Sequence, residues 1–166
     1  MGLFTGRKTV FVDSDILVIG GGFSGCGATY ESRYWGRDLK VVVVEKANIE
    51  RSGAVAQGLY AINCYMGMQW NENQPEDHVR YARNDLMGLV REDLGYDIAR
   101  HVDSTVHKFE EWGLPIMIDP ETGQYQREGK WQIMIHGESY KPIVAEACLL
   151  YTSPSPRDGL LSRMPS

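Results

Sequence analysis

The sequence predicts an α/β fold that begins with a parallel βαβ unit, and three features of residues 15–45 support this prediction. Two short apolar runs, Ile16–Ile19 and Leu39–Val44, have the length and composition of strands buried on both faces of a parallel sheet. A glycine-rich turn follows the first run, and a segment with helical character, Cys26–Tyr34, leads to the second. The second run ends in an acid, Glu45. This order is typical of the first unit of a Rossmann-like, dinucleotide-binding domain.

The glycine turn between the two strands matches the pattern G-x-G-x-x-G at Gly20, Gly22 and Gly25. In this pattern the first glycine allows a tight turn off the strand, and the second lets the backbone approach a pyrophosphate. The third lets the helix pack against the sheet. Phe23 and Ser24 lie inside the motif, where free N–H groups at the start of a helix attract phosphate oxygens. We therefore assign all five residues to the binding of a dinucleotide.

The acid after the second strand completes the predicted dinucleotide site. Glu45 lies twenty residues after Gly25, where a carboxylate can accept hydrogen bonds from both hydroxyls of a ribose. A carboxylate at this place disfavours a 2′-phosphate, so NADP is not expected. The next residue, Lys46, is included among the cofactor-binding residues.

The composition of the whole chain excludes several classes of function. A length of 166 residues suits one domain or a piece of a larger one, and a net charge of −5 without a basic block argues against nucleic-acid binding. No apolar run approaches the roughly 20 residues of a membrane span, and Met1–Lys8 lacks the apolar core of a signal peptide. Cys26, Cys64 and Cys148 show neither a CxxC pair nor metal-ligand spacing. We expect a cytoplasmic protein without a bound metal.

A second glycine-rich segment, Arg51–Gly58, has too few charges for a solvated linker and too many small residues for an amphipathic helix. Small residues around a few polar ones suit a backbone packed close to a flat ligand, although an irregular core loop has the same composition. Arg51 and Ser52 offer donors for pyrophosphate or ring oxygens. The stretch Leu59–Asn63 follows directly.

The middle of the chain predicts two helices. Apolar residues at helical spacing place the first over Pro75–Leu94, with Asn73 as its cap. Gly95 is expected to end it. The second helix is predicted over Tyr96–Trp112, with Gly113 as its C-cap.

Extended patterns predict a short edge strand at Thr9–Val12 and a small β-hairpin from Leu114–Ile118 and Trp131–Ile135. A further helix is predicted to open at Pro142 and to have barely begun at Ala147. Residues 1–147 are thus predicted to be the N-terminal part of an incomplete dinucleotide-binding domain.

Residues 148–166 have a different composition. Prolines at 154, 156 and 165 and repeated serines fit neither a helix nor a strand. One interpretation is a disordered tail. We favour a non-native sequence, because Cys148–Asp158 resembles translated sequencing-adapter DNA. No functional residue is assigned to this tail.

Several segments together resemble a known family, the alpha subunits of dissimilatory adenylylsulfate (APS) reductases. These belong to the fumarate reductase and succinate dehydrogenase flavoprotein superfamily, which pairs an N-terminal G-x-G-x-x-G with a loop like Arg51–Gly58. The narrower resemblance is carried by Arg51–Gly58, Asn84–Leu94, Phe109–Pro115 and Trp131–Lys141. It covers residues 15–147 and implies FAD rather than NAD as the cofactor.

The resemblance also implies a mechanism and a set of site residues. APS reductases interconvert APS plus two electrons with AMP plus sulfite, through a sulfur adduct at the flavin N5. Asn63 matches the family's asparagine near N5 and is the predicted catalytic residue, and Leu59 matches a residue packed near the ring. Succinate dehydrogenases carry a flavin-linked histidine where this chain has Gly53, so the resemblance implies non-covalent FAD. The loop residues assigned to FAD by the same match are Arg51, Ser52, Gly53, Ala54, Gln57 and Gly58.

The implied partner is a ferredoxin-like beta subunit with two [4Fe-4S] clusters, and the implied small molecules are APS, AMP and sulfite. Two alternatives stay open: a fumarate reductase-like hydride transferase, and an inactive, truncated flavin-fold fragment. His78, His101 and His107 lack a second ligand at a useful spacing and are expected at surface or interhelix positions.

Overall fold

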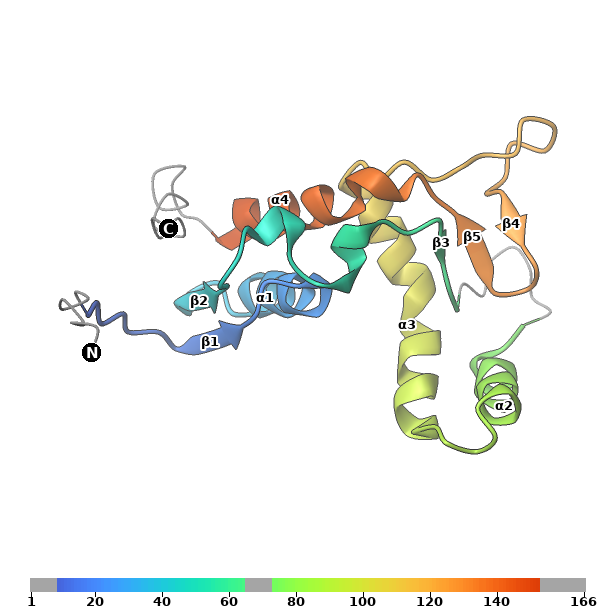
Figure 1. The fold of residues 1–166 in the computed structure, drawn as a ribbon, viewed down its shortest axis with the longest axis horizontal. Helices are drawn as coiled ribbons and strands as arrows, with labels where there is room; N and C mark the ends of the chain where they lie inside the picture. Colours follow the sequence, from blue (N-terminus) through green and yellow to red (C-terminus); the bar gives the residue numbers. More distant parts are fainter. Residues whose placement is uncertain (1–8, 65–72, 153–166) are drawn as a thin grey trace, which may run out of the picture.

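The computed structural model describes residues 9–64 and 73–152, with side chains up to Leu150. The βαβ unit forms as predicted. Strands β1 (Ile16–Ile19) and β2 (Val41–Val44) pair in parallel along their whole length, and helix α1 (Phe23–Trp35) connects them. Helix α4 (Tyr140–Thr152), from the far end of the chain, packs along α1 (Figure 1). The fold class expected from the sequence is therefore confirmed.

The prediction that the first strand is buried on both faces is wrong for this structure. Leu17 and Ile19 expose 55% and 83% of their surface, whereas Val18 lies beside Gly25 of α1. Within the described residues the helices cover one face of this two-stranded sheet. Alternate side chains of β1 therefore point into solvent.

A second, antiparallel sheet has the strand order β3–β5–β4, with β3 at Ala61–Ile62, β4 at Arg127–Glu128 and β5 at Gln132–Met134. The predicted hairpin exists, but its first arm differs from the prediction. Leu114–Ile118 contributes only the isolated bridges of Ile116 to Ile135 and of Ile118 to Tyr125. Thr9–Val12 forms no strand and is exposed, because it has no partner strand among the described residues.

The predicted helix over Pro75–Leu94 is two elements. Helix α2 spans Pro75–Asp85, and helix α3 spans Glu92–Glu111, so Gly95 lies in the first turns of α3 and ends nothing. The first helix stops because Met87 and Gly88 adopt left-handed φ values of 50° and 83°. The acidic pair Glu92 and Asp93 then starts the next helix, where negative charge is favourable.

The predicted cap of α2 is wrong, whereas the predicted C-terminal glycine of α3 is confirmed. Gln74, not Asn73, is the cap of α2, and its N–H donates to Asp77 at 3.1 Å. Gly113 follows α3 with a φ of 84°, and the N–H of Leu114 donates to the carbonyl of Phe109 at 2.9 Å. This bond closes the helix end in the manner expected of a C-terminal glycine.

The main core lies between α1, α3 and α4, and it extends to the residues beside the second sheet. Cys26, Phe109, Tyr140 and Val144 are among its buried residues. A smaller cluster of Val106 and Ile133 joins α3 to β5. Figure 1 shows α3 running from this junction away from the βαβ unit, with α2 beside its far end. No helix in the two described ranges is long and apolar enough to cross a bilayer.

Helix α4 begins two residues before the predicted start at Pro142 and continues to Thr152, past the predicted boundary after residue 147. Cys148 is buried in the core. The sequence 148–152 contains no helix breaker, and the first proline comes at 154, which explains the extension. Residues 153–166 lie outside the described residues, so a non-native tail stays a prediction.

Candidate functional site

The glycine turn between β1 and α1 has a backbone that only glycine fits at two positions. Gly20 has a φ of 97°, and its N–H donates to the carbonyl of Val44 at 2.7 Å, which joins the turn to β2. A Cβ on Gly25 would lie 1.8 Å from the carbonyl oxygen of Gly20. The helix can therefore start directly against the end of the strand. Gly22, in an extended conformation, is the last residue before α1.

Glu45 lies at the end of β2, directly beside this turn. Its Oε2 accepts the N–H of Gly21 at 2.6 Å, and its Oε1 accepts the N–H of Ala47 at 2.9 Å. The N–H of Ala47, and then that of Gly21, lower the pKa of Glu45 below its ordinary value. The carboxylate is thus ionised at neutral pH. A carboxylate offers about four acceptor positions in all, and at least two of them accept backbone N–H groups here.

The second glycine-rich segment folds against the first. It contains two short 3-10 helices, η1 (Ile49–Arg51) and η2 (Ala54–Gln57). Between them the buried hydroxyl of Ser52 donates to the carbonyl of Gly21 at 2.8 Å. Gly53 has a φ of 81°, and a Cβ on it would lie 3.0 Å from the Cα of Gly22. Two segments that are separate in sequence thus form one glycine-lined surface.

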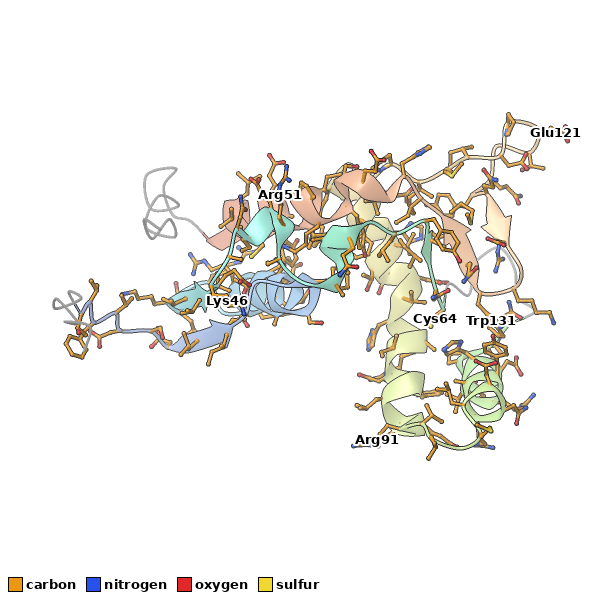
Figure 2. All side chains as sticks on the ribbon, viewed as in Figure 1. Lys46, Arg51, Cys64, Arg91, Glu121 and Trp131 are labelled. Atoms are coloured by element: carbon orange, nitrogen blue, oxygen red, sulfur yellow. The ribbon has the colours of Figure 1, made fainter. Side chains whose placement is uncertain are left out.

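The remaining residues of the predicted site are solvent-exposed in the described chain. Figure 2 shows Lys46 and Arg51 on the side of the βαβ unit, with Cys64 far from both at the end of β3. The predicted residues Ser24, Lys46, Arg51, Ala54, Gln57, Gly58 and Leu59 are all exposed. Their contacts with FAD stay predictions.

Asn63 lies at the far end of this segment, directly after β3. Its Oδ1 accepts a hydrogen bond from the Nε2 of Gln132 on β5 at 2.6 Å. The backbone of Leu59 is pressed against Gly137, where a Cβ would lie 1.5 Å from the carbonyl oxygen of Leu59. The structure therefore brings Leu59 and Asn63 together with the β5–α4 region, away from the glycine turn.

Phe23, assigned to the cofactor from the sequence, packs into a group of side chains behind the glycine turn, and sequence reasoning missed the other members of this group. Phe23 stacks on Tyr140 with ring centroids 5.5 Å apart and packs against Phe109 at 5.8 Å. Lys141 is only 1% exposed, and its ammonium lies 3.6 Å from the Sγ of Cys26 and donates to the carbonyl of Ile49. A lysine at the start of a predicted helix carries no sequence signal of burial, so only the packing of α4 on α1 reveals it.

The lysine and a second thiol affect the acidity of the buried Cys26. A hydrogen bond from Cys148, and then the positive charge of Lys141, lower the pKa of Cys26. The hydrogen bond and burial raise the pKa of Cys148. Neither cysteine forms a disulfide.

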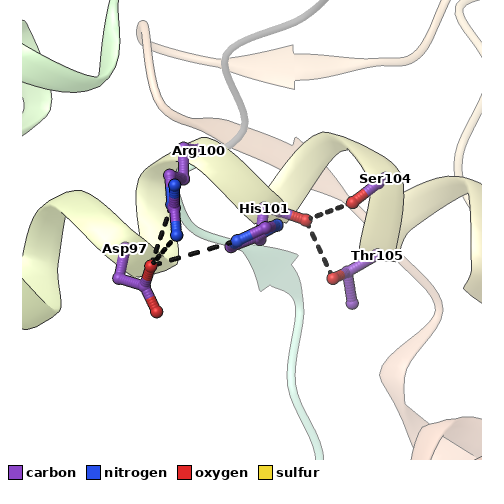
Figure 3. A network of polar contacts seen from close by, with 5 residues as sticks. All are labelled: Asp97, Arg100, His101, Ser104 and Thr105. Carbon is purple, nitrogen blue, oxygen red and sulfur yellow. Dashed lines mark hydrogen bonds and ion pairs between the residues drawn. The ribbon is translucent and has the colours of Figure 1, made fainter. Parts of the chain in front are cut away.

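The histidines on α3 occupy surface positions, as predicted. Figure 3 shows His101 beside Asp97, which also binds Arg100 at 2.7 Å, while the hydroxyls of Ser104 and Thr105 donate to the carbonyl of His101. His107 pairs with Glu110 at 3.1 Å. His78 differs, because its Nε2 lies 3.0 Å from the Sγ of Cys64. Within residues 9–64 and 73–152, no group of three or more potential ligands could hold a metal ion.

Comparison with known proteins identifies the family to which this arrangement belongs. Residues 15–142 match the family model described as an FAD binding domain. This chain belongs to that family. The adenylylsulfate reductase subunit alpha of Megalodesulfovibrio gigas is 51% identical in an alignment 156 residues long, and the match covers 80% of this chain and 23% of the relative.

Two solved structures show how far the similarity extends. An adenosine-5-phosphosulfate reductase in complex with sulfite, as a covalent adduct, is 62% identical, with a TM-score of 0.79 over 85% of this chain and 23% of that one. The FrdA subunit of quinol fumarate reductase from E. coli is 19% identical, with a TM-score of 0.67 over 83% of this chain and 24% of that one, and shares the fold. The chain therefore spans about a quarter of the length of the relatives it matches.

FAD is the cofactor that this family binds, and the residues present fit it on steric grounds. The close contacts of Gly25 with Gly20 and of Gly53 with Gly22 leave a surface without side chains beside the ionised Glu45. Such a surface lets a pyrophosphate approach backbone N–H groups at the start of α1.

Proposed function

We propose that this chain is the FAD-binding part of an enzyme that interconverts APS and two electrons with AMP and sulfite. The observation that carries the proposal is the 62% identity, over 85% of this chain, with a reductase that binds sulfite. The 19% identity with the fumarate reductase subunit supports a shared fold only.

In this proposal, FAD supplies the ring that exchanges two electrons with the sulfur of the substrate. The chain supplies binding and orientation. Gly20–Gly25 hold the pyrophosphate at the start of α1, and Glu45 accepts the ribose hydroxyls. Asn63 donates to the sulfur-bound oxygens, where negative charge is concentrated. Leu59 packs near the ring.

We further propose that FAD is held without a covalent link. A covalent link of the succinate dehydrogenase type needs an imidazole where this chain has Gly53. The φ of 81° and the contact with Gly22 also disfavour any side chain at this position. Denaturation of the holoenzyme in acid should therefore release all of its flavin into the supernatant.

The proposed partner is a beta subunit with two [4Fe-4S] clusters, which would exchange the electrons. The support for a partner is the 51% identity with a relative that is named as the alpha subunit of its reductase. Three cysteines without a disulfide fit a reducing compartment, and we propose the cytoplasm.

The test uses the complete alpha subunit, loaded with FAD and paired with its beta subunit. We expect reduction of an artificial electron acceptor that depends on both AMP and sulfite, together with bleaching of the flavin's visible band by sulfite. Turnover of succinate or fumarate without any response to sulfite would instead support the hydride-transferase alternative. The isolated 166-residue chain is expected to aggregate or to bind FAD poorly, since it exposes Leu17 and Ile19.

We also propose that the native sequence departs from this one at Cys148. A long sequencing read across the junction of Ala147 and Cys148 tests this. An intact frame of several hundred further residues is expected. A genomic stop codon after Ser166 would leave a truncated remnant, and the catalytic proposal for this chain would be withdrawn.

A further inference from the structure

We propose that Gln132 is a positioning residue that fixes the amide of Asn63. It holds the amide with the nitrogen, a hydrogen-bond donor, directed toward an anionic substrate oxygen such as that of sulfite. This inference rests on the proposed function, because it takes Asn63 to lie at the reactive end of the flavin. None of the comparisons assigns a role to Gln132.

The strand register places the two amides opposite each other. Ala61 pairs with Met134 and Ile62 pairs with Ile133, so the next pair in the antiparallel ladder is Asn63 with Gln132. Ile133 is fully buried against α3, and Ile62 packs with it. Because successive side chains point to opposite faces of a sheet, Asn63 and Gln132 lie on the face directed away from this core.

The hydrogen bond between the two side chains selects one orientation of the Asn63 amide. The Nε2 of Gln132 donates to the Oδ1 of Asn63 at 2.6 Å. An asparagine side chain has one acceptor oxygen and one nitrogen with two N–H groups. With the oxygen engaged by Gln132, the nitrogen of this exposed side chain is the group left to meet a ligand. A sulfur-bound oxyanion needs donors of this kind.

A second contact runs parallel to the first and holds the backbone. Cys64 has a left-handed φ of 71°, and its Sγ lies 3.0 Å from the Nε2 of His78. The ring of His78 meets Trp131 edge-on, with centroids 5.4 Å apart. Asn63 therefore contacts Gln132 directly. Its neighbour Cys64 contacts Trp131, the neighbour of Gln132, through the ring of His78.

Burial favours the neutral forms in this second contact. It raises the pKa of the Cys64 thiol and lowers the pKa of His78. A neutral thiol can donate its S–H to a neutral imidazole nitrogen. The support of Asn63 thus involves no formal charge that would compete for an anionic ligand.

The experiment measures the dissociation constant for sulfite, from the bleaching of the flavin's visible band, in the complete alpha subunit loaded with FAD. Gln132→Leu removes the hydrogen bond and should weaken sulfite binding about tenfold, equal to one ordinary hydrogen bond. Gln132→Glu should weaken it more. A carboxylate only accepts hydrogen bonds, so the Asn63 amide must turn its nitrogen inward and its oxygen toward the anion.

Asn63→Ala and the double variant Asn63→Ala/Gln132→Leu complete a double-mutant cycle. Asn63→Ala should weaken sulfite binding at least tenfold, and the added Gln132→Leu should cause no further loss, because Gln132 acts through Asn63. Gln124→Leu and Gln124→Glu, at an exposed glutamine on the hairpin loop, are the matched controls and should bind sulfite like the parent. FAD stoichiometry and the melting temperature check that each variant is folded.

The outcomes separate this inference from the proposed function. If the parent itself shows no response to sulfite, both fail. If Asn63→Ala binds sulfite like the parent, Asn63 is not at the reactive end, and this inference fails while the proposed function stands. If Asn63→Ala weakens binding while both Gln132 variants, fully loaded with FAD, match the parent, only the positioning role is overturned. Additive losses in the double variant would also overturn it. Should Gln132→Leu fail to fold, the near-isosteric Gln132→Glu decides the question.

Discussion

The two ends of the proposed FAD site are built in different ways. At the glycine turn the backbone makes the surface, because a Cβ on Gly25 would overlap the carbonyl oxygen of Gly20 and a Cβ on Gly53 would crowd the Cα of Gly22. At the other end two side chains make it, since the amide of Asn63 is bound by that of Gln132, 69 residues further along the chain.

Mutations at the two ends should therefore affect different properties. In the proposed site the glycine turn sets how well FAD is held, and Gly25 in this turn tolerates no added Cβ. The Asn63 end is proposed to bind an anion at the flavin ring, which depends on which atom of the Asn63 amide faces outward. Changes at the first end should reduce the content of FAD, and changes at the second should reduce the affinity for sulfite in protein that still holds FAD.

The largest effect is expected for Gly25→Ala. The added Cβ would overlap the carbonyl of Gly20, so the strand and helix must separate, which costs roughly 3 kcal/mol together with most FAD binding. Gly27→Ala is the matched control in the same helix, where a Cβ meets nothing within 4 Å. It should be neutral or stabilising by up to about 1 kcal/mol. Flavin absorbance per subunit and the melting temperature measure both, and equal behaviour of the two variants would contradict the steric account.

A smaller effect is expected for Lys141→Met, which keeps the length of the side chain and removes the ammonium. The carbonyl of Ile49 loses its buried donor, and we expect a loss of about 2 kcal/mol of stability with weaker FAD binding. Protein that retains FAD should bind sulfite normally. The exposed Lys40→Met serves as the control and should change stability by less than about 0.5 kcal/mol. A defect in sulfite affinity alone would show that the two ends are coupled.

Glu45→Gln should weaken FAD binding about tenfold, because a neutral amide accepts ribose hydroxyls less strongly than a carboxylate does. The pH dependence has a definite sign. The pKa of Glu45 is depressed in the folded protein, so its contribution to stability is complete above the ordinary value of about 4.3. It is lost as the pH falls through the lower, folded value. Unfolding curves of parent and Glu45→Gln between neutral and acid pH should converge only at the acid end.

The smallest effect concerns the strained residue beside Asn63. Cys64→Ala removes the contact with His78 but keeps the φ of 71°, and should destabilise the protein by about 1 kcal/mol. Cys64→Gly also removes the contact but relieves a left-handed conformation that costs about 1 kcal/mol for other residues, so it should lie close to the parent. Melting temperatures that rank the alanine variant above the glycine variant would refute this account of the turn.

Local patterns predicted the parts of the fold that are contiguous in sequence. The strand, glycine turn, helix and strand of residues 16–44 form as expected, and Gly113 ends α3. The single helix over Pro75–Leu94 was wrong, because the pattern of apolar residues continues through Met87 and Gly88, where the backbone turns left-handed. Leu114–Ile118 forms only two isolated bridges, because a strand needs continuous pairing with a neighbouring strand, which composition alone does not guarantee.

The sequence by itself determined the βαβ unit, the glycine turn with its acid and the family, because these depend on residue types at fixed short spacings. Three features follow only from the folded chain. Ser52 and Gly53 lie against the glycine turn, and Lys141 is buried behind it. Gln132 faces Asn63. These contacts join segments far apart in the chain. They depend on the register of β3 with β5 and on the packing of α4 on α1, which no local pattern encodes.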